Sequence, residues 1–228
     1  MQQIALDIGL VSGPTLTNFL AGPNLAPWQH IQLWVASDLR SPVPTYLWGE
    51  GSSGKTHLLR AAQAALRDQG CAVGWMDASV SEPAAFDNAW RVLILDDVHL
   101  YSALQQHTAF NWFVNAMTPD DGQQRWVLSA GDAPPTALTL REDLRTRLGW
   151  GHIFQLQVLS EPERRAVLRQ QADERGVFLS DDVMDFMLKR FSRDLSSLVQ
   201  LLDQLDGYAL QTQRAITIPL LKSMLEAM

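Results

Sequence analysis

Short apolar runs alternate with longer segments of helical periodicity through the first two thirds of the chain. The runs fall at residues 46–48, 71–76, 91–97, 125–130 and 153–156. Strands that helices cover on both faces have this near-continuous apolar composition. Strands that alternate with helical segments predict a parallel sheet. We therefore expect an α/β fold in which helices sandwich a parallel sheet.

The pattern changes at Ser160, after which only helical periodicity remains. Apolar positions such as Val183, Phe186 and Met187 recur on one helical face, which gives each helix a single buried stripe. The predicted helices cover 161–175, 180–191 and 194–212, and a last one opens near 218–219. We expect these segments to form a small all-α lid that follows the sheet domain.

Composition and charge narrow the class of protein. The 228 residues hold 18 Lys and Arg against 25 Asp and Glu, a net charge of −7, which argues against sequence-specific DNA binding as the main role. Cys71 is the only cysteine, so an internal disulfide and a cysteine-based metal cluster are excluded. No apolar stretch reaches the roughly 20 residues that cross a membrane, and the N-terminus lacks the basic region of a signal peptide. We expect a cytoplasmic protein.

The segment from Gly49 to Thr56 matches G-x-x-x-x-G-K-[ST] at every position, between an apolar run and a helical segment. Glycines let backbone N–H groups surround phosphate oxygens, and the helix that follows offers its positive end. The alternative is a Gly/Ser turn that happens to precede a lysine. We expect Lys55 to reach the β- and γ-phosphates of ADP or ATP, and Thr56 to bind Mg²⁺. The predicted nucleotide-binding residues are Gly49, Glu50, Gly51, Ser52, Ser53, Gly54, Lys55, Thr56 and His57.

A second motif, which is acidic, follows the apolar run Leu93-Ile94-Leu95. Asp96 and Asp97 come where this predicted strand ends, which is the edge at which open α/β sheets bind their ligands. We expect Asp96 to hold Mg²⁺ through water and Asp97 to act as a base or to orient water. A solvated loop or a helix cap is the alternative.

These motifs, with Leu-Arg-Thr-Arg-Leu-Gly-Trp-Gly at 144–151, resemble the AAA+ module of the bacterial replication initiator DnaA. Residues 15–24 resemble the segment that leads into that module and lines its adenine pocket, which implies a nucleotide contact for Asn24. The resemblance divides the chain into an N-terminal peptide at 1–10, an AAA+ domain at 11–159 and a lid at 160–228.

DnaA carries a helix-turn-helix domain after the lid, whereas this chain stops at Met228 and has almost nothing ahead of the module. That arrangement, with the lid sequences at 204–208 and 216–219, is similar to the Hda family of DnaA-homologous regulatory inactivators. The resemblance implies a negative regulator of replication initiation that binds adenine nucleotide and stimulates hydrolysis of DnaA-bound ATP. It leaves homo-oligomerisation and intrinsic ATPase activity open.

The resemblance also implies roles for three further residues. Arg147 corresponds to an arginine finger, Asp132 to the first sensor of the γ-phosphate, and Arg193 to the second sensor, in the lid. Each has a structural alternative. Arg147 could form an ion pair with Glu142 or Asp143, Asp132 could belong to a turn, and Arg193 could pair with Asp194.

Proteins of the Hda family dock on the sliding clamp, the β subunit of DNA polymerase III, through an N-terminal peptide. The matching positions here are Gln3, Ile4, Leu6 and Ile8. An extended peptide whose alternate apolar side chains fill a groove is a reasonable docking element. A terminal strand or a frayed tail is the alternative. A DnaA-related helicase loader and a non-catalytic DnaA-like adaptor remain alternatives for the whole chain, and the peptide argues against both.

Overall fold

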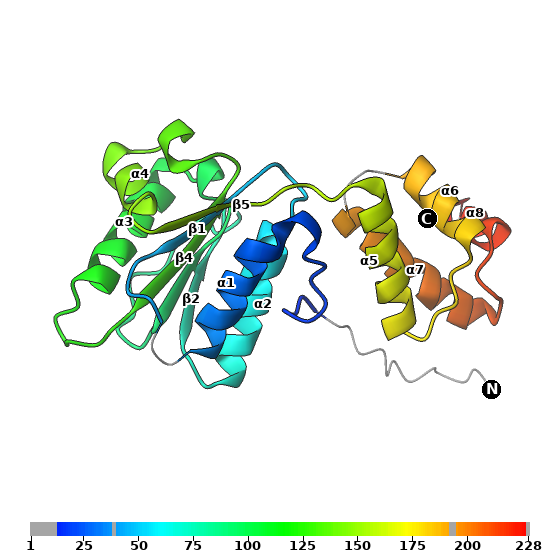
Figure 1. The fold of residues 1–228 in the computed structure, drawn as a ribbon, viewed down its shortest axis with the longest axis horizontal. Helices are drawn as coiled ribbons and strands as arrows, with labels where there is room; N and C mark the ends of the chain where they lie inside the picture. Colours follow the sequence, from blue (N-terminus) through cyan, green and yellow to red (C-terminus); the bar gives the residue numbers. More distant parts are fainter. Residues whose placement is uncertain (1–12, 38–39, 192–194, 227–228) are drawn as a thin grey trace. The chain divides into compact units, whose positions relative to one another are not determined.

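A computed structural model of the protein describes residues 13–37, 40–191 and 195–226. The described chain forms two compact units, the first at Gly13–Val158 and the second beginning at Leu159. Figure 1 shows the helices and strands of each unit, and each unit has its own hydrophobic core. None of the helices in these ranges is both long enough and apolar enough to cross a membrane.

The first unit contains a five-stranded parallel sheet in the order β2-β3-β4-β1-β5. The predicted parallel α/β fold is confirmed. β2 begins two residues later than its apolar run, although the carbonyl oxygen of Ala72 already accepts hydrogen bonds from the N–H groups of Arg91 and Val92. The strands are β1 (Thr45–Trp48), β2 (Val73–Met76), β3 (Val92–Leu95), β4 (Trp126–Gly131) and β5 (His152–Gln155).

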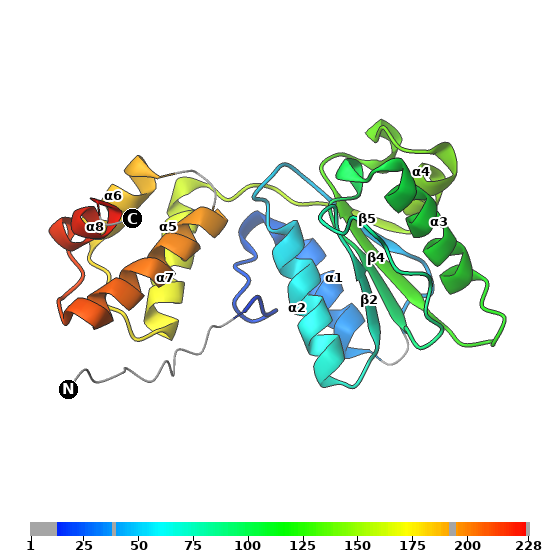
Figure 2. The same ribbon diagram turned by 180° about the vertical axis from the view of Figure 1, so that it is seen from behind.

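Helices cover both faces of this sheet, as Figure 2 also shows from behind. Side chains of β3 alternate between two clusters: Val92 and Ile94 pack with α1 and α2, whereas Leu93 and Leu95 pack with α3 and α4. This double burial is why the strands are apolar without alternation. The helices are α1 (Leu25–Ala36), α2 (Lys55–Asp68), α3 (Ala103–Met117) and α4 (Glu142–Leu148), with 3-10 turns η1 (Gly22–Asn24), η2 (Val98–Leu100) and η3 (Pro135–Ala137).

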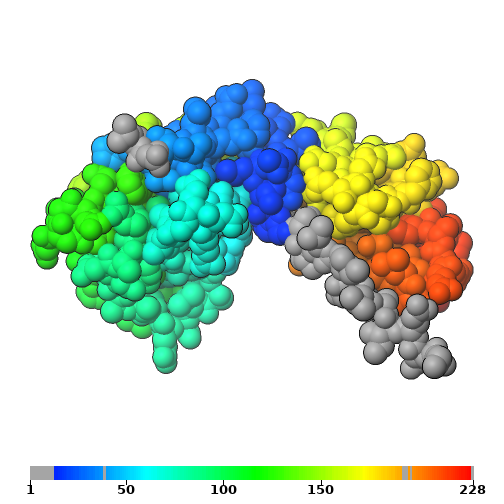
Figure 3. Space-filling view, turned by 90° about the horizontal axis from the view of Figure 1, so that it is seen from below, coloured from blue at the N-terminus to red at the C-terminus, as the bar shows by residue number. Residues whose placement is uncertain are grey.

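The space-filling view in Figure 3 shows α1 (blue) and α2 (cyan) side by side on the surface of this unit. Both helices bury one side against the sheet through residues such as Ile31, Trp34 and Leu58, which are at most 4% exposed. The loop that enters α2 therefore has a fixed position at the end of β1.

The second unit is the predicted all-helical lid. Its helices are α5 (Glu161–Glu174), α6 (Asp181–Arg190), α7 (Leu195–Thr212) and α8 (Ile218–Glu226). Leu168, Met184, Leu202 and Leu221 meet in its core and are fully buried. Ser160 caps α5 in a capping box with Glu163, which explains the change of pattern at this residue.

Candidate nucleotide site and arginine pocket

The predicted phosphate loop connects β1 to α2, and its backbone requires glycine at two positions. Gly54 precedes the first residue of α2 with φ at +96°, in the left-handed region. A Cβ on Gly49 would lie 2.2 Å from the carbonyl oxygen of Leu156. Gly54 has no side chain to cap α2, so no side-chain hydrogen bond caps the positive end of that helix. This loop fits a phosphate group.

Lys55 lies within the loop and is only 6% exposed. Its ammonium group donates hydrogen bonds to the carbonyl oxygens of Gly49 (2.7 Å) and Glu50 (2.9 Å). Burial lowers the pKa of Lys55, and the charges of Asp97, Asp96 and Asp132 oppose that shift. The structure thus brings the predicted lysine and the three predicted carboxylates into one electrostatic cluster.

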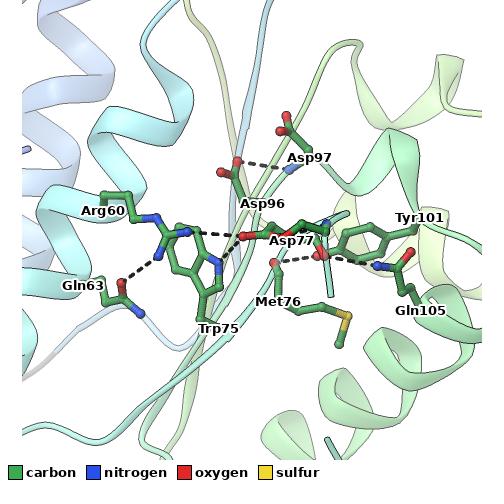
Figure 4. A network of polar contacts seen from close by, with 10 residues as sticks. Arg60, Gln63, Trp75, Met76, Asp77, Asp96, Asp97, Tyr101 and Gln105 are labelled. Carbon is green, nitrogen blue, oxygen red and sulfur yellow. Dashed lines mark hydrogen bonds and ion pairs between the residues drawn. The ribbon is translucent and has the colours of Figure 1, made fainter. Parts of the chain in front are cut away.

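Asp96 follows β3 and is nearly inaccessible, with 2% of its surface exposed. One of its carboxylate oxygens accepts the N–H of Asp97 at 3.0 Å (Figure 4). Hydrogen bonding by the Thr56 hydroxyl acts to lower the pKa of the same carboxyl group. Burial and then the charge of Asp97 raise the pKa of Asp96 to about 6. Asp96 forms no ion pair with any described residue, although the charge of Arg60 acts on it, so this buried carboxylate is suited to receive a cation.

The oxygen atoms of Thr56 and Asp96 fit Mg²⁺ in the way it commonly binds to nucleotides. Mg²⁺ takes one or two protein oxygens, and the substrate phosphates and water complete its shell. The described residues contain no cluster of three or more His, Cys, Asp or Glu side chains able to hold a metal by themselves. A Mg²⁺ ion here would therefore depend on the phosphates of the nucleotide.

Asp132 follows directly after β4, at the same end of the sheet. Its carboxylate lies 3.9 Å from Nδ1 of His99, a residue that the sequence did not single out. The preceding Gly131 is required, because a Cβ there would lie 2.2 Å from the Tyr46 hydroxyl. That hydroxyl donates to the carbonyl oxygen of Ala133 and so fixes the segment that carries Asp132. The sensor role of Asp132 stays a prediction.

Asn24 and His57 attach residues 15–24 to the rest of the unit. The Asn24 amide accepts the N–H of Gln157 (2.7 Å) and donates to its carbonyl oxygen (2.9 Å). His57 lies 3.1 Å from the carbonyl oxygen of Thr15, and its ring centroid lies 5.5 Å from that of Phe19. Phe19 also lies against Gly54. The segment therefore borders the phosphate loop, and nucleotide contacts by Asn24 and His57 stay predictions.

A polar network next to Asp96 was not foreseen (Figure 4). The Arg60 guanidinium of α2 lies 3.6 Å from the centroid of the Trp75 ring and 3.2 Å from the carboxylate of Asp77. Trp75 donates to the same carboxylate at 2.8 Å, and Gln105 of α3 donates to the carbonyl oxygen of Asp77. The network joins α2, the end of β2 and α3 beside Asp96 and Asp97, the carboxylates that follow β3 and that correspond to a Walker B motif. A lone arginine in a helix has no sequence signal for such a contact.

Arg147 lies in the last turn of α4, beside an open pocket of about 640 Å³. Its guanidinium carbon lies over two rings, 5.0 Å from the centroid of Phe110 and 4.8 Å from that of Trp150. Neither alternative ion pair, with Glu142 or with Asp143, is formed among the described residues, and Asp143 binds Arg141 at 2.7 Å instead. The pocket is lined by Phe110, Arg141, Glu142, Asp143, Thr146, Arg147 and Trp150.

The remaining predicted site residues lie outside the residues that the structure describes. They are the second sensor and the clamp-binding peptide, namely Arg193, Gln3, Ile4, Leu6 and Ile8. Their roles stay predictions.

Comparison with known proteins supports the resemblance to Hda and DnaA. The family model described as "Hda, lid domain" matches residues 161–225. An uncharacterized protein of Haemophilus influenzae is 34% identical over 231 residues, with 98% of each chain covered. The structure is similar to domain III of the Thermotoga maritima replication initiation protein DnaA, with a TM-score of 0.72, 18% identity and coverage of 93% of this chain and 95% of that one. The chain belongs to the Hda/DnaA-related AAA+ proteins.

More distant structures share the fold alone. AMPPCP-bound DnaA from Aquifex aeolicus has a TM-score of 0.66 and 22% identity, and the match covers 85% of this chain and 65% of that one. The RuvB Holliday junction branch migration motor of Thermotoga maritima has a TM-score of 0.65 and 15% identity, over 94% of this chain and 72% of that one. The phosphate loop, the Walker B strand and the helical lid thus belong to an AAA+ architecture.

Proposed function

We propose that the protein is a clamp-tethered AAA+ regulator that stimulates hydrolysis of DnaA-bound ATP and so inhibits replication initiation. Membership of the Hda/DnaA-related proteins supports a role in regulating DnaA. The structural observation that carries the finer proposal is the state of Arg147. Its guanidinium forms no ion pair or hydrogen bond with any other described side chain, and it faces an exposed pocket.

The location of Arg147 in the sheet unit favours action on a partner. Gly151, four residues later, packs against Pro44, just before β1 begins. The phosphate loop starts where β1 ends, and β1 and β5 are parallel. The chain after Arg147 therefore enters the sheet at the end opposite the phosphate loop. This geometry supports insertion of Arg147 into the site of a neighbouring molecule.

In this proposal, the chain's own site binds ADP or ATP through residues that are already clustered. Lys55 would contact the phosphates, and Thr56 and Asp96 would hold Mg²⁺, which neutralises phosphate charge when it is bound. Arg147 supplies a guanidinium to the ATP of DnaA, where it stabilises charge on the transferring phosphoryl group. The predicted peptide at Gln3 and Leu6 attaches the protein to the clamp on DNA.

The test measures hydrolysis of DnaA-bound ATP with and without this protein and DNA-loaded clamp. Arg147→Ala should lower the stimulated rate on the order of 10³-fold, as for other arginines that act in trans. Arg147→Lys should rescue poorly, because an ammonium lacks the planar fork of donors. Arg145→Ala, on the same helix but not lining the pocket, is the matched control and should stay near the wild-type rate.

Stimulation that survives Arg147→Ala would remove the finger from the proposal. A second measurement tests the tether: replacing Gln3 and Leu6 together by alanine should abolish co-elution with the clamp and leave the melting temperature unchanged. If the wild-type protein binds the replicative helicase and not the clamp, the helicase-loader alternative replaces this proposal.

A further inference from the structure

Trp150 is an unusually exposed tryptophan, with 54% of its surface accessible. It follows α4 by two residues, and the Arg147 guanidinium lies over its ring at 4.8 Å. The second ring, Phe110, comes from α3 and lies 5.0 Å from the same guanidinium. Arg147 is thus held by rings from two different parts of the chain.

Such contacts restrict an arginine without neutralising it. A free arginine side chain has about 2 kcal/mol of rotamer entropy, which docking at a partner must remove. An ion pair would also restrict the side chain, but it would occupy N–H donors and cancel the charge. A ring under the guanidinium attracts the cation through its electron-rich face. The in-plane N–H donors of Arg147 remain available for a phosphate.

Arg141 at the same pocket provides an internal contrast. Its guanidinium carbon lies 5.6 Å from the Phe110 ring, but its donors are engaged by the Asp143 carboxylate and by Nδ1 of His107 at 3.1 Å. This pairing occupies Asp143, one of the two acidic side chains that line the pocket, and the other, Glu142, forms no ion pair with Arg147. The pocket therefore contains one paired arginine and one arginine that is held only by aromatic rings.

We propose that Trp150 is a positioning residue: its ring, together with that of Phe110, holds the Arg147 guanidinium oriented toward the pocket before a partner binds. The proposal rests on the proposed function of Arg147. It assigns Trp150 an effect on the rate of the chemical step rather than on the affinity of the complex, because preorganised groups act mainly in the transition state.

The kinetic test compares Trp150→Leu, which removes the aromatic face but keeps an apolar side chain, with the conservative Trp150→Phe. Trp150→Leu should lower the maximal rate of stimulated DnaA-bound ATP hydrolysis about tenfold, with the half-saturating concentration changed less than about twofold. Trp150→Phe should restore the rate to within about threefold. Phe178→Leu, which alters an 82% exposed ring in the lid, is the control and should leave both parameters unchanged.

A spectroscopic measurement tests the positioning itself, independently of any partner. In protein labelled with ¹⁵N-arginine, the Arg147 side-chain resonance, assigned by its loss in Arg147→Ala, should carry a ring-current shift. That shift should collapse in Trp150→Leu and persist in Phe178→Leu. An unchanged Arg147 resonance in Trp150→Leu overturns the proposal, as does a variant that alters only half-saturation. A wild-type protein that fails to stimulate hydrolysis contradicts the proposed function, whereas the resonance still tests the positioning.

Discussion

The nucleotide site and the arginine pocket differ in how their charged groups are surrounded. Lys55 and Asp96 are almost completely buried, and loop carbonyls, a hydroxyl and neighbouring carboxylates surround them. Arg147 is partly exposed and contacts only rings through its guanidinium among the described residues. The first region is assembled within one chain and needs only a small ligand. The arginine pocket has the composition of a surface that binds a partner protein.

This comparison predicts that changes in the buried site alter stability or ligand affinity, whereas changes in the exposed pocket hardly alter either. The four substitutions below test it in order of decreasing effect.

Asp96→Asn should stabilise the nucleotide-free protein at pH 8 by about 2 to 3 kcal/mol. The pKa of Asp96 is raised from 3.8 to about 6, so the native state binds a proton at Asp96 more tightly than the unfolded state does. Stability from this group is fully present below about pH 4 and is lost as the pH rises through 6. Asparagine resembles the neutral acid at every pH. Denaturant unfolding should therefore give a difference at pH 8 that disappears near pH 4, and an equal difference at both pH values would contradict this account.

Asn24→Ala should lower the free energy of unfolding by about 1 to 3 kcal/mol, because it removes both hydrogen bonds that the buried Asn24 amide makes with the backbone of Gln157. Urea denaturation measures this loss, and calorimetry measures ADP affinity in the same variant. A variant of normal stability that binds ADP poorly would mean that Asn24 serves the nucleotide and not the fold.

Lys55→Ala should weaken binding of adenine nucleotide at least about tenfold, which corresponds to about 1.4 kcal/mol. The reason is that Lys55 is the cation inside the phosphate loop. Calorimetric titration with ADP is the measurement. Arg67→Ala, which removes an exposed cation from the last turn of the same helix, is the matched control and should bind as the wild type does. Unchanged ADP binding by Lys55→Ala would remove the phosphate loop from the argument.

Arg141→Gln should change the free energy of unfolding by less than about 0.5 kcal/mol, because exposed ion pairs contribute little. Thermal and urea unfolding both measure it. A loss comparable to that of Asn24→Ala would show that the arginine pocket supports the fold, and the contrast between the two regions would fail.

Much of the architecture could be predicted from periodicity. The apolar runs at β1, β3 and β4 reflect burial on two faces, and the change at Ser160 reflects helices that each bury one stripe. The residues at strand ends also come together as expected, because parallel strands deliver their carboxyl ends to one edge. Lys55, Asp96, Asp97 and Asp132 are within electrostatic reach for that reason.

Side-chain partners could not be predicted in this way. Nothing in the order of residues indicates that Asp143 pairs with Arg141 and leaves Arg147 to Phe110 and Trp150. The amide of Asn24 hydrogen-bonds to Gln157, which lies 133 positions later in the sequence. Periodicity carries no information about pairs so far apart in the chain.

By itself, the sequence determined the sheet, the lid and the phosphate loop of this protein, because burial patterns and short motifs are local properties of the chain. Only the tertiary structure determined which charged side chains form ion pairs. Arg141 and Arg147 are the same residue type, six positions apart, at the N-cap and in the last turn of α4, yet one is paired and the other is held by rings. That difference depends on where α3 presents its side chains, and so on how distant segments pack.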